Sequence, residues 1–466
     1  MNADEVSGDE NLTRQMRAAA REIFAHALAE SSIERAFSRK VYYERGVLQV
    51  GADLFDLGTF SRIFVVAIGK AAHHSLEALV SRLGGGVKAT GIVSAPTRPT
   101  SQVSGFRYYE GGHPLPNGES LRAAEAILRG LDSLTEDALA IYLISGGGSA
   151  VVEKPIDEEI AFDELVESYR ALVHSGVPIA EMNAVRKHLS AVKGGRMAVA
   201  AAPAQQLSIM VSDVPDNALD SLASGPTMPD SATAGQCYEI AQRYGLLPKL
   251  PAGVRGLFER RALEETPKSD DPAFVRARWW PILSNSCTLQ AAAERATQLG
   301  FAVEIDNRCD DWDYRQAADY LLQRLRELRK RGPQQASVGL LGWKSGAPAK
   351  GPHVCLISGG ELSVKVDRAQ GVGGRNQQFA LYCAQQMRGE DICILSAGTD
   401  GIDGNSRAAG AVVDGSTISR AQEKGLSAED ALANFDAFPL FDALGDAIAT
   451  GPTGTNVRDV RVLLAW

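Results

Sequence analysis

Short apolar runs of strand length, each followed by a stretch with helical spacing, set the main constraint on the fold of this chain. Strands of a parallel sheet are nearly continuous apolar runs, because helices cover both faces of the sheet. Alternation of such strands with helices predicts an α/β fold with a mainly parallel sheet. The expected strands are 63–68, 91–93, 139–144 and 207–211, and the expected helices are 71–83, 118–131, 157–174 and 190–202.

A stretch at 245–280, rich in proline and mixed charges, interrupts this alternation. The chain has 466 residues, whereas single hydrophobic cores stop growing near ~250–300 residues. We therefore expect an N-terminal domain at 1–250 and a second, smaller C-terminal α/β or α+β domain at 280–466. A further loop is expected at 331–352. The expected C-terminal strands are 281–284, 354–357, 362–366, 392–396, 411–413 and 460–464, and the expected helices are 376–387 and 440–449.

The N-terminal segment has the pattern of an amphipathic helix. Met16, Ala20, Ile23 and Ala27 recur at helical spacing after Thr13, a suitable N-cap residue. The first thirty residues mix acidic and basic side chains and lack the apolar core of a signal peptide. We expect a scaffold helix here and no secretory signal.

Charge and cysteine content exclude several classes of protein. A net charge of −9 argues against a nucleic-acid binder, because phosphate backbones attract basic surfaces. The six cysteines form no C-x-x-C pair, which is typical of reduced thiols in a cytoplasmic protein. The apolar runs are far shorter than the ~20 residues of a membrane helix, so no membrane partner is expected.

Two strand ends carry glycine-rich turns suited to an anion. The string Leu-Ile-Ser-Gly-Gly occurs at 143–147 and again at 356–360, so two equivalent strand ends are expected. Glycines let backbone N–H groups approach an anion without a Cβ in the way. Gly69 and Lys70 follow another strand, where an ammonium and a helix N-terminus can act together on a phosphate. An ordinary turn and a solvated lysine remain the alternatives.

A basic cluster lies between 183 and 196, within an otherwise helical pattern. The glycine pair at 194–195 costs ~1 kcal/mol per residue in a helix, which indicates a close backbone approach. A charged helix face with a structural histidine is the alternative. The polar residues of this cluster that we expect to contact substrate are Asn183, Arg186, Lys187, His188 and Lys193.

Loop carboxylates and one arginine complete the candidate chemistry. Asp213, Glu361 and Asp400 lie in turns, and Mg²⁺ prefers a few such oxygens together with phosphate and water. Asp-Gly turns are also common loop punctuation, so a turn role remains open for Asp400. Arg375 stands between two glycines and Asn376, and arginine is the bidentate binder of phosphate and carboxylate.

Several familiar motifs are missing from the sequence. It has no G-x-x-x-x-G-K-[ST] phosphate loop and no protein-kinase motif set. No G-x-G-x-x-G follows the first strand, which disfavours a nicotinamide dehydrogenase. The histidines and cysteines lack the spacing of zinc ligands.

Taken together, the motifs resemble those of the glycerate 2-kinases that carry a C-terminal MOFRL domain. The similarity runs through nearly the whole chain in the family's order. One departure is Asp216-Asn217-Ala218 after Pro215, where the family often carries Gly-Asp-Asp. The matching strings are 69–72, 111–117, 145–149, 183–196, 212–215, 223–227, 358–361, 373–377, 399–404 and 451–456.

The resemblance implies transfer of the ATP γ-phosphate to the 2-hydroxyl of D-glycerate, giving 2-phosphoglycerate, with Mg²⁺. It implies a Rossmann-like N-terminal domain, a MOFRL domain at about 352–460 and an active site in the cleft between domains. Lys70 and Arg375 match the two positions expected to act in catalysis. Contacts to substrate or phosphate are expected from Gly69, Ser145, Gly146, Gly147, Gly148, Ser149, Asn183, Arg186, Lys187, His188, Lys193 and Asn376, with Asp213, Glu361 and Asp400 as metal ligands.

Two other functions stay open at this point. Members of this family have carried the name hydroxypyruvate reductase, so an oxidoreductase is one alternative. A non-catalytic protein that binds an organic acid or a sugar phosphate is the other. The sequence leaves the oligomeric state open, a homodimer included.

Overall fold

A computed structural model describes residues 3–331, 353–366 and 371–466. The chain divides into two compact units. The parallel-sheet unit consists of Ile33–Ser284, and the mixed-sheet unit consists of Met1–Ser32 together with Asn285–Trp466. The predicted loop at 331–352 lies outside the described residues, apart from its first residue.

The parallel-sheet unit contains a six-stranded sheet in the order β6-β5-β4-β7-β8-β9, with every neighbouring pair parallel. Its central strand β7 is buried along its whole length, as its apolar sequence requires. The predicted α/β fold with a mainly parallel sheet is therefore confirmed. The strands are β4 (Arg62–Ile68), β5 (Ala89–Ala95), β6 (Phe106–Glu110), β7 (Ala138–Ser145), β8 (Gln205–Val211) and β9 (Ala277–Leu283).

The strand order reverses between β4 and β7. From β4 the chain passes through α3 (Ala72–Leu83) to β5 and then β6 on one side, and α4 (Gly118–Leu131) returns it to β7 on the other side. Ile68 pairs with Ile144, so both strands end at the same edge of the sheet. In open α/β sheets ligands bind beyond the carboxyl ends of the strands at such a reversal. This position therefore becomes the first candidate for a binding site.

Helices and a small sheet complete the parallel-sheet unit. The strands β1 (Val41–Glu44), β2 (Val47–Val50) and β3 (Asp53–Asp56) form a three-stranded antiparallel sheet that the sequence analysis did not predict. The stretch at 245–280, where a domain boundary was expected, contains η3, α10 and η4 and lies inside this unit. The remaining helices are α2 (Ile33–Lys40), η1 (Leu57–Thr59), α5 (Gly148–Val151), α6 (Phe162–Val173), α7 (Ile179–His188), α8 (Arg196–Ala201), η2 (Asp216–Ser224), α9 (Ala234–Arg243), η3 (Leu247–Lys249), α10 (Ala252–Glu259) and η4 (Pro272–Phe274).

The predicted helix at 190–202 was wrong over its first half. Gly194 and Gly195 adopt φ angles of 56° and 87°, in the left-handed region that glycine tolerates and a right-handed helix does not use. The helix α8 consequently begins only at Arg196, and the preceding α7 ends at His188. The glycine pair is thus a helix boundary within the basic cluster.

The mixed-sheet unit has a six-stranded sheet in the order β10-β11-β15-β12-β13-β14. Only the β10–β11 pair is parallel. The predicted strand at 362–366 is absent from the described residues there, where only an isolated bridge joins Ser363 to Asp313. The strands are β10 (Ala302–Ile305), β11 (Val354–Ser358), β12 (Ile392–Gly398), β13 (Gly410–Asp414), β14 (Ala447–Ile448) and β15 (Asp459–Ala465), and the helices are α1 (Ala3–Glu30), α11 (Asn285–Gln298), α12 (Tyr314–Arg331), α13 (Arg375–Gln386), α14 (Thr417–Glu423), α15 (Ala428–Ala433) and α16 (Ala437–Leu444).

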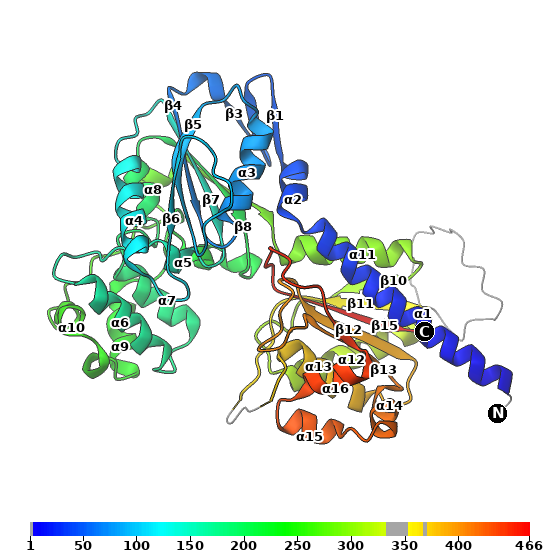
Figure 1. The fold of residues 1–466 in the computed structure, drawn as a ribbon. Coiled ribbons are helices and arrows are strands. Elements are labelled where there is room, and N and C mark those ends of the chain that lie inside the picture. The colour runs from blue at the N-terminus through cyan, green and yellow to red at the C-terminus, as the bar shows by residue number, and fades with distance from the viewer. Residues whose placement is uncertain (1–2, 332–352, 367–370) are drawn as a thin grey trace. The chain divides into compact units, whose positions relative to one another are not determined.

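The first helix belongs to the mixed-sheet unit, where it runs beside α11 (Figure 1). It begins at Ala3, so Thr13 is a helix-interior residue and the predicted N-cap was wrong. Its apolar stripe packs into one core cluster with side chains from α11, β12 and β15. Arg17 pairs with Asp414 and Asp446, which are both buried. No helix in the described part of the chain is long and apolar enough to cross a membrane.

We expect Ile23→Ala to destabilise the mixed-sheet unit by about 2–5 kcal/mol, because Ile23 is fully buried and its loss leaves a cavity. Chemical denaturation monitored by circular dichroism measures this change. Ile305→Ala is the matched control, since Ile305 in β10 is 39% exposed and its truncation opens no internal cavity. Equal midpoints for the two variants would contradict the packing of α1 described above.

Candidate active site

The turns that follow β4 and β7 are joined to each other by hydrogen bonds. The Lys70 N–H donates to the Gly146 carbonyl (2.9 Å), and the Ala71 N–H donates to Ser145 Oγ (3.0 Å). Ser145 Oγ in turn donates to the Ile68 carbonyl (3.2 Å). Both turns are therefore held at the point where the strand order reverses.

The glycine turn after β7 leaves two backbone donors open. Gly147 has a φ of 81°, and in the described part of the chain the N–H groups of Gly146 and Gly147 donate to no protein acceptor. A Cβ on Gly147 would lie 3.1 Å from Lys70 Cγ and 3.2 Å from His113 Cδ2. Open amides beside the exposed ammonium of Lys70 are a suitable receptor for a phosphate.

His113 is a site residue to which the sequence analysis gave no role. Burial and, after it, the nearby Lys70 ammonium lower the pKa of the His113 imidazole. His113 is therefore neutral at pH 7 and can offer a hydrogen bond beside the turn without adding charge. The only signal for it in the sequence was its position inside the family string 111–117.

Ser149 is held by a strained segment at the end of η2. Its Oγ lies 2.8 Å from Ser224 Oγ. Ala223 and Ser224 have φ angles of 51° and 59°, which non-glycine residues seldom adopt. A Cβ on Gly148 would lie 2.6 Å from the Ala223 Cβ, so the glycine permits this close approach. Backbone strain that survives in a well-packed segment often marks a functional site.

Most of the basic cluster at 183–196 is neutralised inside the parallel-sheet unit. Lys187 Nζ contacts Asp230 (3.0 Å) and Asp220 (3.1 Å), and the buried Lys193 ammonium pairs with Glu153. His188 Nε2 lies 3.1 Å from Glu265. These side chains serve the packing of α7 and of the glycine pair, and their predicted contact with substrate stays a prediction.

Arg186 differs from its neighbours in the basic cluster. Its guanidinium lies over the Tyr169 ring at 5.1 Å from the centroid. Its buried Nε has no hydrogen-bond partner, and no carboxylate pairs with it among the described residues. Burial lowers the pKa of Arg186, and Tyr169 and Glu153 oppose that effect. A largely buried cation without a counter-ion is suited to bind an anionic ligand. Asn183, one turn earlier on α7, lies on the same side of the helix.

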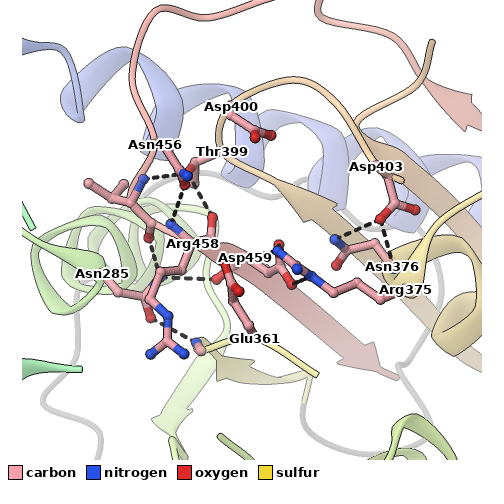
Figure 2. Close-up of polar contacts among 12 residues, drawn as sticks. Asn285, Glu361, Arg375, Asn376, Thr399, Asp400, Asp403, Asn456, Arg458 and Asp459 are labelled. Carbon is pink, nitrogen blue, oxygen red and sulfur yellow. Dashed lines mark hydrogen bonds and ion pairs between the residues drawn. The ribbon is translucent and has the colours of Figure 1, made fainter. Parts of the chain in front are cut away.

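In the mixed-sheet unit, Arg375 is held between two carboxylates (Figure 2). Its Nε and Nη2 donate to Asp459 (2.9 and 3.2 Å), and Nη2 also lies 2.9 Å from Glu361 Oε1. Asp459 is 0% exposed, whereas the side chains of Arg375 and Glu361 are 37% and 33% exposed. Burial acts to lower the pKa of Arg375, but the charges of Asp459 and Glu361 outweigh it and raise the pKa. Arg375 is charged at any accessible pH.

The second glycine turn, after β11, has its backbone donors already occupied. The N–H groups of Gly359, Gly360 and Glu361 donate to side-chain oxygens of Asn307 (3.0 Å), Asn285 (2.9 Å) and Asp310 (3.0 Å). Both glycine turns place their second glycine in the left-handed region, yet this one offers no comparable open amide pair. These hydrogen bonds hold the turn after β11 in the conformation from which the Glu361 side chain reaches Arg375.

Asp403 caps the N-terminus of α13, where Arg375 is the first residue. Its carboxylate accepts from the N–H groups of Asn376 (3.1 Å) and Gln377 (2.9 Å). Burial raises the pKa of Asp403 to about 6, although those two N–H groups act in the opposite direction. Asn376 is buried and donates to Asp403 while it accepts from Ser396 Oγ (2.6 Å), so its side chain orders the helix end.

The predicted metal ligands do not form a cluster within either unit. Among the described residues, no three or more histidine, cysteine, aspartate and glutamate side chains gather as a metal site. Asp213 lies beside Gly146 in the parallel-sheet unit, and Glu361 and Asp400 lie in the mixed-sheet unit. Asp400 accepts from the Ile402 N–H (3.1 Å), as expected for a turn residue. Mg²⁺ is often held by only one or two carboxylates with phosphate oxygens, so these residues still fit such an ion.

Comparison with known proteins decides the family. The model of the MOFRL family matches residues 354–459, and a model described as a domain of unknown function (DUF4147) matches residues 19–259. The D-glycerate 2-kinase of Thermotoga maritima is 34% identical over 403 residues, which are 86% of this chain and 90% of that protein. The chain belongs to the glycerate 2-kinase family with a MOFRL domain.

Other members of the glycerate 2-kinase family agree with the fold. A crystal structure of the Thermotoga maritima glycerate kinase covers 97% of this chain and 100% of its own chain, with 31% identity and a TM-score of 0.81. A protein of Agrobacterium vitis named putative hydroxypyruvate reductase is 35% identical over 405 residues, 86% of this chain and 87% of that protein. The family resemblance inferred from the motifs is confirmed, and the chain is an enzyme of this family.

We expect Lys70→Met to raise the pKa of His113, because the substitution removes the ammonium that disfavours imidazolium. The pKa should stay below about 6.5, since burial continues to act. A histidine titration by NMR measures both values. His353 is the control, because burial alone lowers its pKa and the substitution should leave it unchanged. An unshifted His113 would contradict the proximity of the two side chains.

Proposed function

We propose that this protein transfers the γ-phosphate of ATP to the 2-hydroxyl of D-glycerate and releases 2-phosphoglycerate and ADP. One observation carries the proposal: Lys70 lies beside the open amides of Gly146 and Gly147 where the sheet order reverses. Phosphoryl transfer requires positioning and charge neutralisation more than covalent chemistry. Because relatives of this chain are named glycerate 2-kinases, we assign D-glycerate and ATP as the ligands of this anion-binding arrangement.

Each unit supplies part of the positive charge in this proposal. Lys70 and the two open amides neutralise phosphate oxygens in the parallel-sheet unit, and the guanidinium of Arg375 does so in the mixed-sheet unit. A bound Mg²⁺ would add charge neutralisation between phosphate oxygens, with Asp213, Glu361 and Asp400 as its proposed ligands. Residues from 1–250 and from 280–466 are thus both required for turnover.

Binding of the D-glycerate carboxylate requires a cation that is not already paired with a carboxylate of the protein. Arg186 meets that requirement, and Asn183 can add a hydrogen bond from the same side of α7. Ser149 adds a polar side chain near the glycine turn, and the buried residues Ser145 and Gly148 hold the turn in place. Lys187, His188 and Lys193 act in this proposal by holding the cluster together. All six cysteines are free thiols, which agrees with a protein that works in the cytoplasm.

A coupled assay tests the reaction directly. The purified protein should form 2-phosphoglycerate from D-glycerate, ATP and Mg²⁺, and EDTA should abolish turnover. Enolase-coupled detection distinguishes 2-phosphoglycerate from 3-phosphoglycerate, and the latter as sole product would refute the assignment. NADH oxidation with hydroxypyruvate tests the reductase name carried by some relatives, and none is expected because the dinucleotide fingerprint is missing.

We expect Lys70→Ala to lower kcat by about 10²-fold or more, the usual cost of one preorganised electrostatic donor. Stability should change by less than ~1 kcal/mol, because the side chain is exposed. Lys88→Ala is the matched control, since Lys88 is an exposed lysine of the same unit away from the turns. Steady-state kinetics beside a thermal melt measures both effects, and a kcat within twofold of wild type would leave Lys70 as a solvated loop charge.

Arg375→Ala should lower kcat to a similar extent. It should also cost roughly 1–3 kcal/mol of stability, because it leaves buried Asp459 short of a partner. Arg375→Lys should rescue poorly, since an ammonium cannot reproduce the planar fork. Arg407→Ala removes an exposed arginine from the same unit and serves as the control. Retained kcat in a destabilised Arg375→Ala protein would assign Arg375 to the fold alone.

A further inference from the structure

The two carboxylates on Arg375 occupy different edges of its guanidinium. Asp459 takes the side edge, formed by Nε and Nη2. Glu361 contacts Nη2 at the end edge, and Nη1 on that edge donates to no acceptor among the described residues. A phosphate that binds arginine through two N–H groups therefore has only the end edge available.

Asp459 is fixed in place. It is fully buried at the first position of β15, and its Oδ2 also lies 3.3 Å from Nη2 of the fully buried Arg461. Asn285 Nδ2 donates to its backbone carbonyl (3.0 Å) and thereby ties Asp459 to the glycine turn after β11. Moving this carboxylate would separate the buried charges of Asp459 and Arg461 from each other, which is strongly unfavourable.

Glu361 is the carboxylate that can leave. It is one third exposed and sits directly after Gly360, whose φ of 76° turns the chain out of β11. Its backbone N–H donates to Asp310 Oδ1 (3.0 Å), so the turn is held independently of the Glu361 side chain. An ion pair exposed on both sides contributes little net free energy and is readily exchanged for another anion.

We propose that an incoming phosphate displaces the Glu361 carboxylate from the end edge of Arg375, while Asp459 keeps the guanidinium in position. This inference rests on the proposed function, because it assigns Arg375 to phosphate. Glu361 is then an internal competitor in the absence of ligand. Once displaced, its carboxylate is available to the accompanying divalent cation.

The test is the affinity of the full-length protein for inorganic tripolyphosphate in EDTA, measured by isothermal titration calorimetry. Glu361→Gln keeps the shape of the side chain but removes the competing charge, so it should bind about fivefold more tightly than wild type, as expected from loss of a weak exposed pair. Unchanged or weaker binding by Glu361→Gln overturns the proposal. If Glu361→Gln lacks a cooperative melt, Glu361→Ala is judged by the same two outcomes.

A matched control separates displacement from a general change in charge. Asp311 is exposed, its backbone N–H donates to the Glu361 carbonyl (2.8 Å), and its left-handed φ of 61° tolerates asparagine. Asp311→Asn removes the same charge from the same region and should leave the affinity within twofold. An equal gain in both variants overturns the exchange at Arg375.

A second background locates the effect. In Arg375→Ala protein, Glu361→Gln should no longer tighten binding, because the guanidinium for which Glu361 and phosphate compete is absent. A gain that persists there overturns the proposal. Glycerate is absent from this assay, so its outcome is separate from the kinase assay: a protein that phosphorylates glycerate without showing the exchange refutes only this inference, and an exchange without glycerate turnover refutes only the proposed function.

Discussion

Parallel pairing of β4 with β7 is the constraint on which the candidate site depends. Because Ile68 and Ile144 are paired, β4 and β7 end at the same level of the sheet. The turns that follow them lie on either side of the point where the strand order reverses. Lys70 and the glycines of 146–148 meet only for that reason. A Cβ on Gly147 would lie against Lys70 and His113, so the close approach of the two turns requires glycine at this position.

The two copies of Leu-Ile-Ser-Gly-Gly show that a motif acquires its role from the groups that reach it. Both strings end a buried strand and turn it at a glycine with positive φ. After β7 the N–H groups of Gly146 and Gly147 donate to no acceptor among the described residues, and the turn lies beside Lys70. After β11 the N–H groups of the turn are filled by Asn285, Asn307 and Asp310, in the way that a bound anion would fill them. The first turn is thus suited to receive a charge, and the second to hold a side chain.

Buried strands and the turns at their ends were predicted from local sequence patterns. The apolar runs predicted β4, β7, β8, β11, β12 and β15, since buried strands need no information from elsewhere in the chain. The glycine turns and Lys70 were found because strand ends are recognisable locally. The helix break at 194–195 was missed because the cost of glycine in a helix was considered without its backbone conformation. The strands β1–β3 were missed because each has only four residues, too few to show a clear alternation of buried and exposed side chains.

Long-range pairing was beyond local patterns. Nothing near Lys193 indicates that Glu153 neutralises it, and nothing near Arg375 points to Asp459, which lies far along the chain. The same limit applies to α1. Its stripe of Met16, Ala20 and Ile23 was read correctly as a buried face, but the sheet that buries it is built largely from residues after 353.

The split composition of the mixed-sheet unit has a consequence for synthesis. The parallel-sheet unit is one continuous segment, so all of its strands have left the ribosome before the central strand of the other sheet is made. The first helix is made before the parallel-sheet unit, and its apolar stripe is fully covered only after α11, β12 and β15 have been made. Exposed apolar surface of this kind favours aggregation during folding. The second core is therefore completed only after β15 has been made, and a chain that stops before β15 exposes apolar surface of α1 that chaperones would recognise.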